Sequence, residues 1–186
     1  NLFTIGALWI VALHYFALYL GRGEEPGNLL YALLAILFLL RVLAVSKLPY
    51  LLIDHDHIIS TRISYITMFL LPTVYLMFLR SLFPNEVSRV LAVGLLVVGS
   101  ICSLLTLFTE AAVFTMSRDF FSNIILLTLI YTMYAVVMAV IRKREDALLV
   151  FGINALFAAA GINDPLLYQQ LISSNDLSQY GFLVLI

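Results

Sequence analysis

The chain is a series of long apolar stretches joined by short polar segments, and this pattern limits its fold more than any motif. Crossing a bilayer takes a helix of ~20 mostly apolar residues. Six stretches fit, namely residues 2–20, 28–48, 60–83, 88–108, 120–141 and 147–168, and a seventh begins near residue 179. Their apolar residues run continuously instead of alternating, which favours helices over a barrel. We therefore predict an all-α fold, a polytopic membrane bundle of seven transmembrane helices with the seventh truncated.

The composition agrees with this class of protein. Hydrophobic residues make up 63% of the chain, charged residues 11%, and the mean hydropathy is +1.06. A soluble domain has about 25% charged residues, so this chain has too few charges to cover a water-exposed surface. We expect the lipid bilayer to be its main partner, and the net charge of -1 gives no attraction to nucleic acid.

The distribution of Lys and Arg predicts the orientation of the helices, because cytoplasmic connections are enriched in both. One set of connections with its flanks carries six basic residues, and the opposite set carries three: Arg22, Arg80, Arg89, Arg142, Lys143 and Arg144 against Lys47, Arg62 and Arg118. The "RKRED" connection is then cytoplasmic, the N-terminus lies outside and the C-terminus is cytoplasmic. Both ends lie in apolar runs, so we expect residues 1–186 to be a single transmembrane domain cut from a longer protein.

Ionisable residues inside two apolar stretches indicate a candidate ligand pocket. Arg41 lies ~20 Å along the stretch that starts at Asn28, and Asp164 lies ~26 Å along the stretch that starts at Ala147. Both would be in the outer half of a ~30 Å core, where such residues usually face a bundle interior or a wet cavity. We predict an outward-opening pocket whose floor uses Arg41, Asn163 and Asp164, with Arg62 and Glu110 at its rim. Alternatively, Arg41 extends to the headgroups and Asp164 is simply solvated.

Two prolines within the apolar stretches predict helix kinks. Pro72 should bend the helix over 60–83. Thr73 or Thr67 could take up the hydrogen bonds that it frees. We favour a fixed bend over a hinge. Pro165 removes a backbone donor from the carbonyl of Gly161. Nearby polar groups or water must then satisfy that carbonyl.

The remaining polar residues predict no catalytic or metal site. The "DHDH" segment, residues 54–57, has ligand types that suit a transition metal, but no second cluster completes a site, which favours an exposed loop. Cys102 is the lone cysteine and forms no intramolecular disulfide. We expect His14 to be a buried histidine with a core hydrogen bond, or a pH sensor, and Asn154 to bond across helices. No catalytic constellation or cofactor site is present, so this fragment is not expected to be an enzyme.

Three segments resemble a bacterial family, the membrane domain of seven-transmembrane receptors with diverse intracellular signalling modules. They are "RISYITMFLLPTVYLMFLRSLFP" (62–84), "RKREDALLVFG" (142–152) and "GINDPLLY" (161–168). The resemblance implies a multi-pass sensor domain of the bacterial cytoplasmic membrane, with an extracytoplasmic ligand-binding module before it. It also implies a cytoplasmic output module after it, such as a histidine kinase of a two-component system, a diguanylate or nucleotide cyclase, or a phosphatase.

This resemblance favours a receptor that relays an unidentified small-molecule or protein ligand on the outer side to the output enzyme. A homodimer is expected because such output enzymes generally work as pairs. A membrane transporter and a structural subunit of a membrane complex are the alternatives. The mostly Leu, Val, Ala and Phe residues at mid-depth disfavour a transport path.

Overall fold

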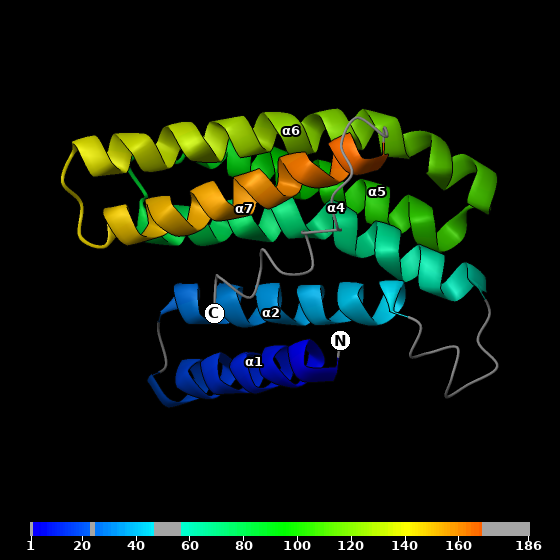
Figure 1. Cartoon of the computed structure of the whole chain (residues 1–186), viewed down its shortest axis with the longest axis horizontal. Coiled ribbons are helices and arrows are strands. Elements are labelled where there is room, and N and C mark those ends of the chain that lie inside the picture. Colours follow the sequence, from blue (N-terminus) through cyan, green and yellow to red (C-terminus); the bar gives the residue numbers. More distant parts are fainter. Residues whose placement is uncertain (1, 23–24, 47–56, 169–186) are drawn as a thin grey trace. The chain divides into compact units, whose positions relative to one another are not determined.

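The computed structural model describes residues 2–22, 25–46 and 57–168, and every regular element in these residues is a helix (Figure 1). The helices in chain order are α1 (Leu2–Arg22), α2 (Pro26–Val45), α4 (His57–Leu82), α5 (Arg89–Phe108), α6 (Ala111–Ile141) and α7 (Ala147–Tyr168). The predicted all-α fold is confirmed. The predicted seventh helix lies outside the described residues.

Five of these helices are long and apolar enough to cross a membrane, judged by length and composition. The five spans are Leu2–Gly21, Pro26–Val45, Ile58–Leu82, Arg89–Phe108 and Phe120–Ile141. In α7, residues Ala147–Leu156 form a shorter apolar helical segment. The spans agree closely with the apolar stretches found in the sequence.

Two helices begin earlier than predicted. The segment 109–119 was expected to be a connection, but α6 starts at Ala111. His57, expected in an extended loop, is the first residue of α4. Charged residues such as Arg118 and Asp119 end a membrane span, but they do not end a helix, because no Pro or Gly interrupts residues 111–119. The prediction of a loop there was therefore wrong.

The chain divides into two compact units, Asn1–Thr128 and Leu129–Ile186. In the first unit α1 packs on α2, α2 packs on α4, and α4 packs on α5. Aromatic rings join these layers: the ring of Tyr31 on α2 lies 4.3 Å from that of Tyr15 on α1 and 5.4 Å from that of Phe78 on α4. The rings of Phe69 on α4 and Phe121 on α6 meet edge to face at 4.6 Å, and both side chains are fully buried.

The helices α4 and α5 approach each other most closely at Gly99. A Cβ atom at this position would lie 2.8 Å from both the Phe69 carbonyl oxygen and the Thr73 hydroxyl, which is closer than real contacts allow. The buried face of α5 consists of Ala92, Gly99, Ser103 and Thr106. Small side chains of this kind let membrane helices pack backbone to backbone. Gly99 therefore sets the separation of the two helices.

The helix α4 continues through Pro72 to Leu82. The Thr73 hydroxyl lies 3.2 Å from the Phe69 carbonyl and 3.3 Å from the Leu95 carbonyl of α5, and Thr67 donates to the Ser64 carbonyl at 2.9 Å. Neither threonine reaches the Met68 carbonyl that Pro72 leaves without its usual donor. A threonine hydroxyl reaches back three or four residues, so Thr73 meets Phe69 and joins α4 to α5 instead.

The second unit contains the end of α6 and the whole of α7. Asn154 on α7 is fully buried and donates a hydrogen bond from its amide nitrogen to the thioether sulfur of Met133 on α6, at 3.1 Å. The predicted bond of Asn154 across helices is thus confirmed. The side chains of residues 161–168 lie outside what the structure describes, although the backbone there is helical.

The end of α6 is closed by a Schellman motif. The backbone N–H of Arg144 donates to the Ala139 carbonyl at 3.0 Å, and that of Lys143 donates to the Val140 carbonyl at 2.9 Å. Lys143 occupies the left-handed position of this motif, with φ of 53°. Glycine usually occupies this position, because a Cβ atom is strained there.

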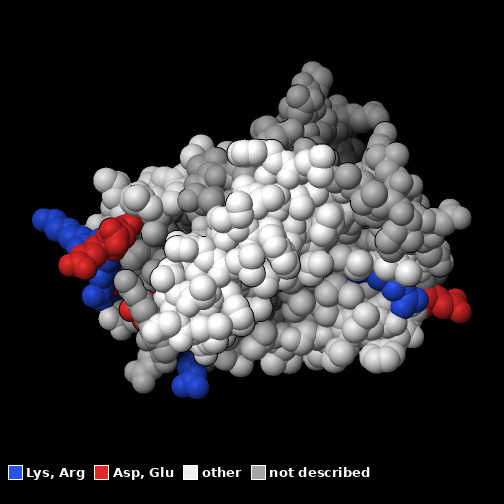
Figure 2. Space-filling model, turned by 90° about the horizontal axis from the view of Figure 1, so that it is seen from below, with Lys and Arg blue, Asp and Glu red and all other residues white. Residues whose placement is uncertain are grey.

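Charged side chains lie at the margins of the face shown in Figure 2, and the surface between them is uncharged. This distribution matches helices whose middle sections face lipid.

Substituting Gly99 should separate α4 from α5. Gly99→Ala is expected to lower the free energy of unfolding by about 1–3 kcal/mol, because the added methyl group meets backbone and a hydroxyl at 2.8 Å. Gly94→Ala is the matched control on the same helix, since a Cβ atom there meets nothing within 4 Å. Thermal unfolding of the purified protein in detergent measures both changes. Equal melting temperatures for the two variants would contradict the close contact.

Substituting Lys143 should stabilise the end of α6. Lys143→Gly relieves the left-handed strain and is expected to raise the free energy of unfolding by about 1 kcal/mol. Lys143→Ala removes the same charge but keeps the strain, so its melting temperature should stay at or below that of the unsubstituted protein. If both substitutions stabilise equally, the charge and not the backbone conformation is the cause.

Candidate functional site

Arg62 bonds α4 to the C-terminal end of α5. Its guanidinium donates to the Leu107 carbonyl, and to the Thr109 carbonyl at 3.1 Å. The last carbonyls of a helix have no partner within the helix, and the helix dipole gives this end a partial negative charge. The half-buried guanidinium of Arg62 supplies both hydrogen-bond donors for these carbonyls and a positive charge at this end of the helix. The Leu105 carbonyl of the same turn accepts both the backbone N–H of Thr109 at 2.9 Å and its hydroxyl at 2.6 Å.

Arg41 bonds α2 to the same part of α4. Its guanidinium donates to the Ser64 carbonyl at 3.4 Å, and this carbonyl also accepts the Thr67 hydroxyl. Arg41 is half-buried and lies four residues before the end of α2 at Val45. We call this region the Arg62 end: the C-terminal ends of α2 and α5 and the N-terminal end of α4. There the first turns of α4 are bonded to a helix on each side.

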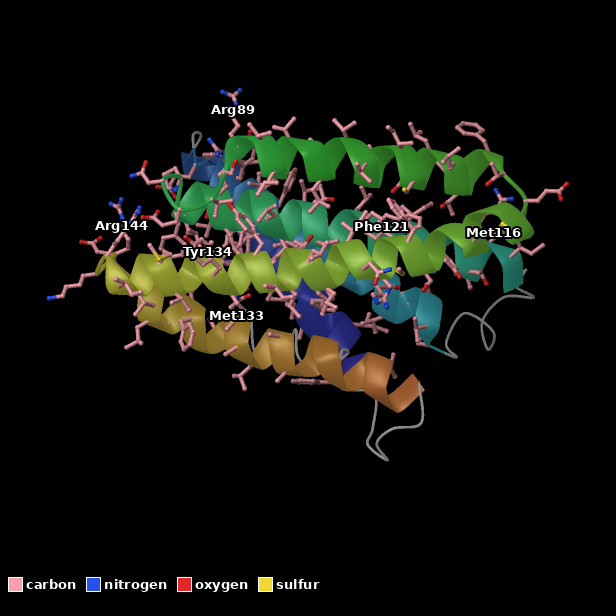
Figure 3. All side chains as sticks on the ribbon, turned by 90° about the horizontal axis from the view of Figure 1, so that it is seen from above. Arg89, Met116, Phe121, Met133, Tyr134 and Arg144 are labelled. Atoms are coloured by element: carbon pink, nitrogen blue, oxygen red, sulfur yellow. The ribbon has the colours of Figure 1, made fainter. Side chains whose placement is uncertain are left out.

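A third arginine repeats the arrangement at the opposite end of α4. Arg80, in the last turn of α4, donates to the Val87 carbonyl at 2.9 Å, two residues before α5 begins. Arg62 and Arg80 thus bond α4 to both ends of α5, and Gly99 lies against α4 between them. Figure 3 shows Arg89, at the start of α5, and Met116, near the start of α6, beside opposite ends of α5. The helices α4 and α5 are therefore held together at three levels.

Arg62 has more donors than its two bonds to α5 use. A guanidinium has five N–H donors, and two of them bond carbonyls of α5. Among the side chains that the structure describes, the other donors have no partner, and neither does the carboxylate of Glu110. Glu110 is exposed and directly follows Thr109. The Arg62 end therefore offers both a cationic donor and an anionic acceptor to a molecule outside the chain.

The predicted pocket residues are only partly described. Arg41, Arg62 and Glu110 all lie at the Arg62 end of the first unit. The side chains of Asn163, Asp164 and Pro165 lie outside the described residues. The pocket floor of Arg41, Asn163 and Asp164 stays a prediction.

Sequence reasoning missed the acceptors of the arginines. It treated Arg62 as a pocket rim and Arg80 only as a basic flank, whereas Arg62 bonds carbonyls at the end of α5 and Arg80 bonds the Val87 carbonyl before α5. The spacing of small residues at 92, 99, 103 and 106 was a usable signal for the α4-facing side of α5. His14, expected in the core, is exposed on α1. Within the described residues no three metal-ligating side chains gather, and residues 54–56 of "DHDH" lie outside them.

Removing the Arg62 guanidinium should loosen the α4–α5 pair. Arg62→Met leaves two carbonyls without their donor and is expected to cost about 1–2 kcal/mol of unfolding free energy. Arg62→Lys keeps the charge without the forked donor, so an intermediate loss is expected. Arg89→Met is the control, because an exposed positive charge at a helix start opposes the dipole. Thermal unfolding in detergent would contradict this role if Arg62→Met and Arg89→Met behaved alike.

Comparison with known proteins gives one match. The family described as "7TM diverse intracellular signalling" matches this chain over residues 1–186. No curated protein and no solved structure matches it.

Proposed function

Because the chain belongs to the 7TM diverse intracellular signalling family, we propose that it relays an extracytoplasmic ligand signal to a cytoplasmic output enzyme. Membership over the whole length makes it a multi-pass transmembrane signalling domain, and this match is the observation that carries the proposal. The output enzyme would be a histidine kinase, a diguanylate or nucleotide cyclase, or a phosphatase. The setting would be a bacterial cytoplasmic membrane, with the Arg62 end outside.

The Arg62 end supports a ligand-responsive role. Unused donors of Arg62 and the exposed carboxylate of Glu110 suit a ligand that carries both an anionic group and a hydrogen-bond donor. The ligand would compete for the guanidinium that holds the end of α5. A ligand that binds one arrangement of Arg62 better than another shifts the helices toward that arrangement.

The helix α4 is the proposed relay. It is continuous over 26 residues, which corresponds to ~39 Å, longer than the hydrocarbon core. Hydrogen bonds at the first turns of α4 reach α2 and α5. At the other end of α4, Arg80 bonds the connection before α5. A displacement at the Arg62 end would therefore move the whole helix and reach the Arg80 end.

Buried polar side chains argue against the transport alternative. Thr73, Ser103 and Thr106 are buried, and each donates to a carbonyl one turn back on its own helix. These three hydroxyls are therefore not free to line a polar path at mid-depth. Arg41, Arg62 and Arg80 lie toward helix ends, and each bonds a backbone carbonyl.

Weakening the attachments of α4 should change the output per molecule. Arg41→Gln and Arg62→Gln are each expected to shift the basal activity of the output enzyme roughly fivefold or more in the full-length protein. Activity is measured in membranes as phosphate transfer or second-messenger formation, normalised to the amount of folded protein. Glu25→Gln is the control, an exposed carboxylate at the opposite end of α2. If activity per folded molecule is unchanged in both arginine variants, Arg41 and Arg62 have a structural role only, and the proposed relay through α4 is contradicted.

The orientation requires its own control. In a Cys102→Ser background, Glu110→Cys should react with a membrane-impermeant maleimide added to intact cells, and Lys143→Cys should react only after lysis. The reverse labelling would place the proposed ligand site inside the cell.

A further inference from the structure

The Arg62 end lies at the boundary between hydrocarbon and lipid headgroups, and two helices give the same depth. The helix α5 is ~30 Å long, which equals the thickness of the hydrocarbon core. The Leu107 and Thr109 carbonyls, which Arg62 bonds, lie at its C-terminal end. Along α4, the rise from Arg62 to Leu82 is also ~30 Å. When either helix spans the core, the Arg62 guanidinium therefore lies at the level where the phospholipid phosphates begin.

The first turn of α4 continues into the headgroup layer. Residues 57–61 precede Arg62 and extend ~8 Å beyond it. A headgroup layer is ~5–8 Å thick on each side of the core. Ile58 and Ile59, in this turn, are nearly half exposed. A headgroup that lies beside this turn therefore meets the Arg62 side chain at its own depth.

Arg62 presents a phosphate-binding group to this layer. Its hydrogen bond to the Leu107 carbonyl is exposed, and the two bonds to α5 use two of the five donors of the guanidinium. Phosphate oxygens are strong acceptors for such donors, and the pair is charge-assisted. The bonds to α5 already hold the guanidinium in place, so a phosphate meets an ordered side chain. Arg62 can therefore bond α5 and a lipid phosphate at the same time.

Glu110 determines which headgroup fits beside Arg62. Its exposed carboxylate belongs to the residue after Thr109, whose carbonyl lies 3.1 Å from the guanidinium. A carboxylate here repels a headgroup that carries a net negative charge, and it attracts an ammonium group. A phosphoethanolamine headgroup carries a primary ammonium two carbon atoms from a phosphate oxygen, so its two charges match Arg62 and Glu110. The trimethylammonium of a choline headgroup has no N–H to donate to the carboxylate.

We propose that the Arg62 end binds a phospholipid headgroup of the phosphoethanolamine type, with the phosphate on Arg62 and the ammonium on Glu110. This inference rests on the site of the proposed function and names a ligand class for it. In the proposed orientation the lipid belongs to the outer leaflet. The bilayer holds lipid phosphates at the depth of Arg62, so their effective concentration at the site is far above that of a dissolved molecule. A dissolved signal would then act by displacing a headgroup from Arg62.

Quenching of a single tryptophan by brominated lipids tests the site. The one tryptophan of the chain is removed by Trp9→Phe, and Phe108→Trp places a new one beside Thr109. Val90→Trp, at the opposite end of α5, is the matched reporter, because both positions are more than 80% exposed. The chain is reconstituted in phosphatidylcholine vesicles with a minor share of brominated phosphatidylethanolamine or brominated phosphatidylglycerol.

The reporter at 108 should show at least a threefold preference for phosphatidylethanolamine over phosphatidylglycerol, taken as the ratio of their binding constants. The reporter at 90 should show no such preference, since Arg89 there has a positive charge and favours the anionic lipid. Equal quenching by the two lipids at position 108 would overturn the proposal.

Charge variants test the two contacts separately. Glu110→Gln should abolish the preference or turn it toward phosphatidylglycerol, because the repulsion of the anionic headgroup is gone. Glu145→Gln, an exposed carboxylate in the connection between α6 and α7, should keep the preference. Arg62→Gln should weaken the binding of both lipids at the 108 reporter, with thermal unfolding to show that the variant is folded. An unchanged preference in Glu110→Gln overturns the proposal even where Arg62→Gln does not fold.

A dissolved headgroup could supply the same chemistry, and competition distinguishes the two sources. Glycerophosphoethanolamine added at millimolar concentration should leave the quenching by phosphatidylethanolamine unchanged. Displacement of the lipid would assign the site to a dissolved molecule and overturn the lipid source. The vesicle measurement involves no output enzyme, so its failure leaves the proposed relay intact. Lipid selectivity without any change of output in Arg62→Gln would contradict the relay alone.

Discussion

Hydrocarbon offers no hydrogen-bond donor to a carbonyl group, and this constraint explains where the polar side chains of this chain lie. Carbonyls within a helix are satisfied by its own backbone, but those at a helix end need another donor. Arg62 supplies donors at the C-terminal end of α5, and Arg80 supplies one to the Val87 carbonyl in the connection before α5. Hydroxyls of buried threonines and serines donate back to their own helices, as Ser103 does to Gly99 at 2.8 Å. These polar groups therefore hydrogen-bond to backbone carbonyls, and the faces between the helices are formed by small, uncharged side chains.

Narrow faces allow the helices to approach closely, and this makes α4 and α5 act as one body. The contact at Gly99 lies between two arginine bonds, so we expect a displacement at one end of the pair to move both helices. Coupling across a membrane requires such a packed element with few alternative arrangements. The same geometry would serve a receptor better than a transporter, which must open a polar path at mid-depth.

Hydropathy predicted the helices better than it predicted their contacts. All described helix ends lie within three residues of the predicted stretches except the start of α6, where charge ended the span but not the helix. His14 was expected in the core but is exposed. The sequence of α1 is apolar all around, so it does not indicate which face turns inward. The acceptors of Arg62 depend on how α4 is rotated against α5, which no local pattern determines. Asn154 was predicted correctly, because a deep amide in a membrane helix has few options besides a neighbouring helix.

The unequal lengths of α5 and α6 have a consequence for the surrounding lipid. With 20 and 31 residues, the two helices are ~30 Å and ~46 Å long. Only Thr109 and Glu110 separate them, so the first turns of α6 must begin beside the end of α5, and they slope toward it (Figure 1). A longer helix fits a bilayer by tilting or bending, and the required angle grows as the bilayer becomes thinner. Membrane thickness would thus bear directly on the shape of this hairpin, as a mechanical input separate from any dissolved ligand.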